Sequence, residues 1–334
     1  MQRTATSALA LLLLVCAPAV TGAQETAREL TTPGTGDARP GDVVPAVPAA
    51  PPAPALNEHP QSEPKNTGVL LWKVTSSSAT VYLLGSIHVA SADLYPLDPR
   101  IRNAFHASSV LVTELDVSPV GKEQSKRLLE VYGTYPQGDS LDRHIDASTR
   151  QALERIIEER KDSPELSDIW KMRPWYAYLT LTNVALAAAG YKAEWGIEEH
   201  LRRMAGRKKV ETLETMLDQV AIFRDMPEEA QLASLEHAVR NMHELPAAIQ
   251  RAQDAWKRGD GERITDLVVE PLRRANPMLY DRLFTQRNRK MTEAVERYLS
   301  GTGTYFVVVG SGHLLGRDSI LAMLAEKGHR AVQL

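Results

Sequence analysis

The stretch Ala79–His88, ATVYLLGSIH, decides the fold together with a second stretch, Thr304–His313, TYFVVVGSGH. Each is a run of apolar, β-branched and aromatic residues that ends in Gly-Ser-x-His. Each therefore predicts a buried strand followed by a sharp turn. The glycine allows the turn, and the histidine three residues later can face the crevice above the edge of a sheet. Two such turns in one domain would direct His88 and His313 to one place.

Further strands and helices extend this pattern into an α/β fold. GVLLWKV (residues 68–74) forms a β-hairpin with the first stretch, and VLVTEL (110–115), KKVETLE (208–214) and HRAVQL (329–334) are three more strands. The pattern predicts a mostly parallel central sheet with an N-terminal β-hairpin, flanking helices and a large helical insertion. The predicted helices are Pro99–Ser108, Ser148–Lys161, Pro174–Ala189, Glu194–Gly206, the broken region Asp218–Ser300 and Leu315–Lys327.

Four of these strands end in residues that carry chemistry: His88, Glu114, Glu214 and His313. The carboxyl ends of parallel strands share one edge of a sheet, so we expect these side chains to converge. Imidazoles with carboxylates suit a divalent metal such as Mn, Co, Fe or Zn, with His88, Glu114 and His313 as ligands. The same residues also suit a metal-free acid–base site, in which a histidine deprotonates water and Glu114 orients it.

Other residues are candidates for supporting or substrate-binding roles. Gly85 and Gly310 form the two turns, and Gln219 lies about one helical turn beyond Glu214, where it can line the same crevice. Arg287 and Asn288, in QRNRK, can hold an anion or orient a carboxylate. A solvated charged helix face explains QRNRK nearly as well.

Composition and missing motifs exclude several functions. The chain has 334 residues, 43% of them hydrophobic, and a formal charge of −3 with both signs interspersed, so it lacks the basic surface of a nucleic-acid-binding protein. HExxH and Walker P-loop motifs are absent, and no serine lies in GxSxG. The only cysteine, Cys16, falls in the predicted leader, so disulfides and cysteine nucleophiles are excluded from the mature protein.

The N-terminal part of the chain is expected to lie outside the fold. Residues 1–23 combine Arg3, the apolar stretch Ala8–Val20 and small residues before Gln24, which is typical of a secretory signal peptide. Residues 24–67 are rich in Pro and Ala and predict a disordered linker. The folded domain is expected at residues 68–334, exported to the periplasm or the extracellular space, with no membrane span after signal cleavage.

The motifs together resemble the TraB/GumN family, which is related to the Tiki metalloproteases and more distantly to the ChaN-like and erythromycin-esterase-like (EreA) proteins. The likeness rests on LLGSIHVASADLYPL, LVTELD, WGIEEHL, VETLETMLDQ, LFTQRNRKM and VVVGSGHLLG. The resemblance implies an EreA/ChaN-like architecture. It also implies metal-dependent proteolysis through His88, Glu114 and His313, with Arg287 and Asn288 in support.

These observations favour an exported metal-dependent hydrolase, a peptidase, acting on a peptide or small-molecule substrate. The alternative is a non-catalytic protein that binds haem, a peptide or a glycan in the same crevice. A binding protein needs a pocket but no group that activates water. The geometry around the two histidines therefore distinguishes the hydrolase from the binding protein.

Overall fold

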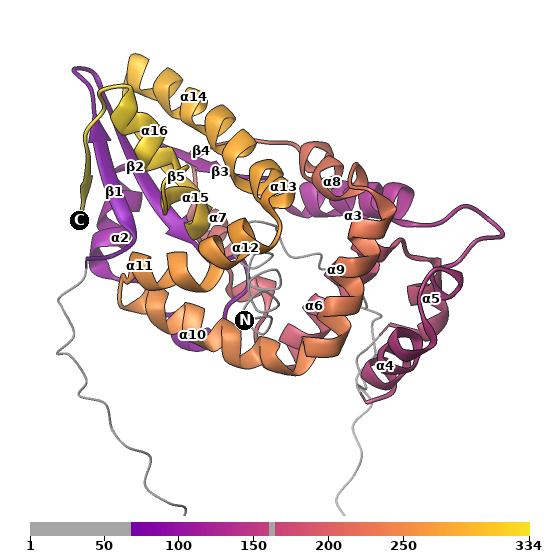
Figure 1. The fold of residues 1–334 in the computed structure, drawn as a ribbon. Coiled ribbons are helices and arrows are strands. Elements are labelled where there is room, and N and C mark those ends of the chain that lie inside the picture. Colours follow the sequence, from indigo (N-terminus) through magenta and orange to yellow (C-terminus); the bar gives the residue numbers. More distant parts are fainter. Residues whose placement is uncertain (1–67, 160–163) are drawn as a thin grey trace, which may run out of the picture. The chain divides into compact units, whose positions relative to one another are not determined.

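The computed structural model describes residues 68–159 and 164–334, and Figure 1 shows their fold. The signal peptide expected at residues 1–23 and the linker expected at residues 24–67 lie outside the described residues and stay predictions. In the part of the chain that is described, no helix has both the length and the apolar character that a membrane span requires.

A six-stranded mixed sheet forms the centre of the fold. In sheet order its strands are β4 (Lys209–Thr212), β3 (Val110–Thr113), β5 (Gly303–Gly310), β2 (Ala79–Ser86), β1 (Leu71–Thr75) and β6 (Ala331–Gln333). The four strands from β4 to β2 are mutually parallel, whereas β1 is antiparallel to both β2 and β6. The predicted α/β class, the mostly parallel sheet and the N-terminal hairpin are confirmed.

The middle strands are buried because they are covered on both faces. In β5, the run Phe306–Val309 has no exposed surface, and in β2 Leu83 and Leu84 are equally buried. Their register pairs Leu83 with Val307 and Leu84 with Val308. Continuous apolar runs are typical of parallel strands between two layers of helices, which is why both stretches were recognisable in the sequence.

Helices cover the sheet. Helix α14 (Gln286–Ser300) packs against β2 and against α16 (Ile320–Glu326), and Figure 1 shows both helices lying across the strands. Helix α2 (Pro99–Ala107) packs against β5, where the Phe105 ring meets Phe306 edge-on at 5.5 Å. Asp98 caps α2 by accepting a hydrogen bond from the Arg100 backbone, which fixes where the helix begins.

The remaining helices form the predicted helical insertion. Figure 1 shows most of them gathered beside the sheet rather than over it. The apolar segment that was expected to be a core helix is α6 (Pro174–Ala188), and it is largely buried. The others are α3 (Pro119–Gly133), α4 (Ala147–Glu158), α5 (Leu166–Lys171), α7 (Ile197–Met204), α8 (Met216–Arg224), α9 (Glu228–Asn241), α10 (Leu245–Lys257), α11 (Gly261–Ile264), α12 (Glu270–Ala275) and α13 (Pro277–Tyr280).

The chain after β5 differs from the prediction. A continuous helix was expected from Leu315, but a short helix, α15 (Ser311–Leu314), comes directly after the strand and α16 begins only at Ile320. Gly316 has a φ of 84°, which interrupts helical geometry, and the Ser319 side chain then caps α16 by accepting from the Ala322 backbone. His313 lies in the short helix α15, which packs against β2 and β5.

Candidate functional site

The strand ends bring the predicted residues together. Glu114 directly follows β3, His88 and Glu214 lie two residues beyond β2 and β4, and His313 lies in α15, which follows β5. All four side chains are buried. The convergence expected from the parallel sheet is therefore present in the structure.

Glu114 lies at the centre of this group. Its Oε1 atom accepts a hydrogen bond from the backbone N–H of Gly310 at 2.5 Å. The same Oε1 atom lies 3.9 Å from Nε2 of His88 and 3.8 Å from Nε2 of His313. One carboxylate oxygen thus faces both imidazoles.

Arg287 holds the other side of Glu114. On α14, its Nη2 atom donates to Oε2 of Glu114 at 2.6 Å, and its Nε atom donates to Oε1 of Glu214 at 2.9 Å. Gln219, on α8, donates to Oε2 of Glu214 at 3.2 Å. Of the two interpretations of QRNRK, the structure favours the orienting role, because one buried guanidinium fixes two carboxylates.

Burial has a consequence for the protonation of Glu114. Loss of solvent raises the pKa of its carboxyl group above the usual value, although the charges of Arg287 and His88 oppose the rise. A carboxylate with a raised pKa is a better proton acceptor than one in water.

Glu198 is a site residue that was not predicted from the sequence. On α7, its Oε2 atom lies 3.0 Å from Nδ1 of His88, and its Oε1 atom accepts a hydrogen bond from the Ser86 hydroxyl at 2.6 Å. This contact leaves Nε2 of His88 directed toward Glu114. The sequence signal was the segment WGIEEHL, but nothing in that segment distinguishes Glu198 from its neighbour Glu199.

Gly196 explains why α7 can come so close to His88. A Cβ atom at Gly196 would lie 2.2 Å from the carbonyl oxygen of His88, so no other residue fits without displacing the backbone. Next to it, the Ile197 backbone N–H donates to the Ile87 carbonyl at 3.1 Å. These contacts fix the first turn of α7, and Glu198 with it, against the end of β2.

The contact with Glu198 also changes the charge balance at His88. Burial lowers the pKa of His88, but the attraction and hydrogen bond of Glu198, with the attraction of Glu114, outweigh it, and the net pKa is raised. Burial would raise the pKa of Glu198, yet His88 and Ser86 hold it below its usual value. Without a metal, the two groups therefore favour an imidazolium–carboxylate pair, and a metal ion that binds Nε2 of His88 would replace the proton on that atom.

His313 is held by a neutral partner. Asn288, on α14, donates from Nδ2 to the Asp318 carbonyl at 2.7 Å, so its Oδ1 atom faces Nδ1 of His313 at 2.6 Å. Nδ1 must then carry the proton, which leaves a lone pair on Nε2. Burial, and then the charges of Arg287 and His88, lower the pKa of His313 well below its usual value.

The glycines of the two turns support this geometry. A Cβ atom at Gly85 would lie 3.2 Å from Cα of Ser311, so the two turns are packed closely against each other. The Gly85 carbonyl accepts a hydrogen bond from the indole of Trp256 at 2.7 Å, and Gly310 donates to Glu114. Both glycines thus position the turns through their backbones.

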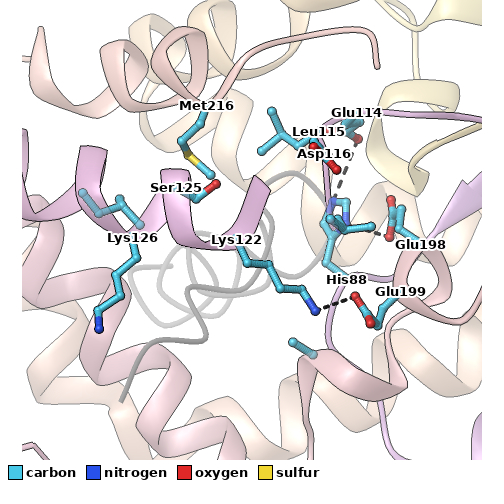
Figure 2. Close-up of a pocket in the computed structure, with 13 residues that line it drawn as sticks. His88, Glu114, Leu115, Asp116, Lys122, Ser125, Lys126, Glu198, Glu199 and Met216 are labelled. Carbon is cyan, nitrogen blue, oxygen red and sulfur yellow. Dashed lines mark ion pairs between the residues drawn. The ribbon is translucent and has the colours of Figure 1, made fainter. Parts of the chain in front are cut away.

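A pocket opens beside this group, and Figure 2 shows the side chains that line it. The space within it is about 770 Å³, a volume that includes open solvent. His88, Glu114 and Glu198 lie on one wall, and Lys122, Ser125 and Lys126 of α3 lie on the other. The ion pair between Lys122 and Glu199, 2.7 Å long, joins the two sides.

The donor atoms are suitable for a metal ion. Within residues 68–159 and 164–334, the ligand atoms of His88, Glu114 and Glu198 lie within 4.8 Å of one another and could hold an ion. The ligand set expected from the sequence had His313 in place of Glu198. His313 is outside that group, but its Nε2 atom and that of His88 are buried and have no hydrogen-bond partner among the described residues. Two ligands bonded to one ion at about 2.1 Å can be up to about 4.2 Å apart. The distance from each of these nitrogens to Glu114 is within that limit, but the two histidines do not form a group with Glu114 in which all ligand atoms lie within 4.8 Å.

Comparisons with known proteins agree with these motifs. Residues 70–333 match the model of the TraB/PrgY/gumN family. The protein YbaP of Escherichia coli (strain K12), described as uncharacterized, is 26% identical over 245 residues, which cover 73% of this chain and 87% of YbaP. An uncharacterized protein of Treponema pallidum (strain Nichols) is 22% identical over 273 residues, 77% of this chain and 80% of that protein. No solved structure matches the chain.

Proposed function

We propose that this chain, which belongs to the TraB/PrgY/gumN family, is an exported metal-dependent hydrolase that cleaves peptide bonds. One observation carries the proposal. Two buried imidazoles each have Nδ1 held by a partner, and each leaves an unpartnered Nε2 atom within 3.9 Å of the same carboxylate oxygen. A purely structural histidine would use both nitrogens, since a buried polar atom without a partner is costly.

The chain supplies three ligand atoms for a divalent ion such as Mn, Co, Fe or Zn. We propose that they are Nε2 of His88, Nε2 of His313 and Oε1 of Glu114. Because His313 lies outside the group whose ligand atoms are within 4.8 Å of one another, its ring must move closer to that of His88 for both to bind one ion. A bound ion would lower the pKa of a water molecule and polarise the carbonyl group to be attacked. In the reaction, water adds across the C–N bond: its oxygen joins the carbonyl carbon, and the nitrogen leaves with a proton as the amine.

The residues around the ligands orient them. Glu198 holds the ring of His88, and Asn288 holds the ring of His313, so both Nε2 lone pairs face inward. Arg287 fixes Oε2 of Glu114, so Oε1, which also accepts the Gly310 backbone N–H, is the atom that would bind the ion or accept a proton from water. The adjacent pocket gives the substrate access to His88 and Glu114.

Metal analysis of the purified mature protein, paired with an activity screen, tests the proposal. We expect about one ion per chain, cleavage of members of a peptide library, loss of cleavage with a chelator, and recovery with Mn or Co. His313→Gln should lose both metal and cleavage. His106→Gln, which removes an exposed histidine at the end of α2, should retain both.

Two outcomes would overturn the proposal. One is cleavage that survives complete removal of metal. The other is a protein that binds haem, a peptide or a glycan in this pocket but cleaves nothing at any metal loading. The second outcome would favour the non-catalytic alternative.

A further inference from the structure

The wall of the pocket opposite the candidate metal site carries positive charge. Lys122, Ser125 and Lys126 are spaced three and four residues apart on α3, which places them on one face of the helix. All three line the pocket. Figure 2 shows Lys122 reaching toward Glu199, whereas Lys126 lies farther from His88.

Most charges in the pocket already have partners. Glu114 pairs with Arg287, Glu198 with His88, and Glu199 with Lys122. Asp116 accepts the Ser118 backbone N–H at 2.9 Å, at the start of α3, where the helix dipole favours a negative charge.

Lys126 is different. Within the described ranges 68–159 and 164–334 its side chain forms no hydrogen bond or ion pair. The hydroxyl of Ser125 donates to the Gly121 carbonyl at 2.8 Å, so it has no proton to offer a ligand. The ammonium group of Lys126 is therefore the positive charge on this wall that no carboxylate neutralises.

Apolar side chains lie between the two ends of the pocket. Leu115 and Leu129 are buried, and Met216 lies with them in the lining. Figure 2 shows Met216 and Leu115 between Lys126 and the group around Glu114. A ligand that spans the pocket would meet apolar surface in its middle and a positive charge at the end remote from His88.

We infer that the substrate is an anionic peptide segment, whose apolar side chain packs against Leu115, Leu129 and Met216 and whose carboxylate pairs with Lys126. This inference rests on the proposed hydrolase function and adds the substrate class. The carboxylate belongs either to an acidic side chain or to the C-terminus of the peptide. Lys126 is in this view a specificity-determining residue that takes no part in bond cleavage.

Matched peptides test the inference. Fluorogenic peptides that differ only in Glu, Gln or Lys next to a leucine are compared, each with a free and an amidated C-terminus. An exposed ion pair favours the Glu peptide over the Gln peptide by about threefold to fivefold in kcat/KM, and added salt reduces the difference. Lys126→Gln should abolish the preference, and Lys126→Glu should reverse it in favour of the Lys peptide. A preference for free over amidated C-termini that is the same for the Glu, Gln and Lys peptides, and is lost in Lys126→Gln, would assign the site to the terminal carboxylate.

The control is Arg127→Glu, which makes the same change of sign at the next residue of α3. Arg127 is exposed, pairs with Glu123 and is not part of the lining, so this variant should keep the wild-type preference. An unchanged preference in Lys126→Glu, or equal rates for all three peptides whether the C-terminus is free or amidated, would overturn the inference and leave the hydrolase proposal intact.

If no peptide is cleaved, the hydrolase proposal fails, and the charge preference is then measured by binding. Fluorescence anisotropy of the same labelled peptides with chelator-treated wild-type protein and with Lys126→Glu serves this purpose. Tighter binding of the Glu peptide that is lost in the variant supports the inference, and equal affinities contradict it.

Discussion

The two Gly-Ser-x-His turns have nearly the same sequence but opposite electrostatic surroundings. Nδ1 of His88 faces the carboxylate of Glu198, whereas Nδ1 of His313 faces the amide of Asn288. The pKa of His88 is raised and that of His313 is lowered well below its usual value. Both rings are buried, so burial does not explain the difference between their pKa values. The difference comes from the partner at Nδ1 and from the nearby charges.

The two histidines also differ in their access to a ligand. His88 is part of the pocket lining, while His313 has no exposed surface and packs against the Phe284 ring at 5.3 Å. The repeated motif therefore supplies one imidazole at the pocket and one behind it. Glu114 is the group that both share.

The largest effect is expected from Glu114→Gln, because this change removes the charge that both Nε2 atoms face. Arg287 keeps Glu214 as a partner, so the fold should persist. We expect kcat/KM for the best peptide to fall by about 10²–10⁴-fold, with urea unfolding still cooperative. Glu211→Gln on β4, a carboxylate that bonds Tyr298 away from the site, is the control. A variant with more than about a tenth of wild-type activity would remove Glu114 from the catalytic group.

The next effect is expected from Glu198→Gln, which gives His88 a neutral partner like that of His313. Losing a carboxylate that orients a ligating histidine typically weakens metal binding by about 10–100-fold. Calorimetric titration with Zn or Mn measures this change, and Glu194→Gln, an exposed residue just before α7, should leave affinity unaltered. Wild-type affinity in Glu198→Gln would mean that Glu198 neither binds nor orients a ligand of the ion.

Much of the fold and part of the site were predictable from the sequence. Long apolar runs that end in Gly, Glu or His predicted both a parallel sheet and the edge where His88, Glu114, Glu214 and His313 meet. These features were predictable because an apolar run and the residue that ends it are local properties of the sequence. The strand order from β4 to β6 was not predicted, since it depends on which distant strands pair.

Glu198 could not be identified because its role depends on a contact between distant segments. From the sequence, Glu198 and Glu199 are two adjacent charges on a polar helix. Only the packing of Gly196 against the backbone of His88 rotates the first toward the imidazole and the second toward Lys122. The one sequence feature that relates to this contact is Gly196, because a glycine directly before a helix allows two backbones to approach closely.

Gly196→Ala tests that close approach and should have a smaller effect. A Cβ atom 2.2 Å from the His88 carbonyl must displace α7, and overpacking of this kind costs about 1–3 kcal/mol. Urea unfolding measures the loss, and weaker metal binding should accompany it because Glu198 moves with the helix. Gly301→Ala is the control, since its nearest neighbour would be 3.5 Å away. Unchanged stability in Gly196→Ala would show that α7 is not held at this point.

The smallest effect concerns pH and the neutral environment of His313. In the metal-free protein, burial keeps the pKa of His313 far below its value in the unfolded chain, near 6.5. The unfolded state then binds the proton more readily, so this contribution to stability is complete above pH 6.5 and is lost as the pH falls below it. The contribution of His313 to the stability of the folded state should therefore fall as the pH is lowered from 7.5 to 5.5. The pKa values of His88 and Glu114 are raised, so these two groups change the stability in the opposite direction, and they do so in wild type and in His313→Gln alike.

Urea unfolding with chelator present measures the contribution of His313. The free energy of unfolding should therefore fall more steeply with decreasing pH in wild type than in His313→Gln. Parallel pH profiles would mean that His313 is protonated in the folded protein, and the contrast between the two turns would disappear.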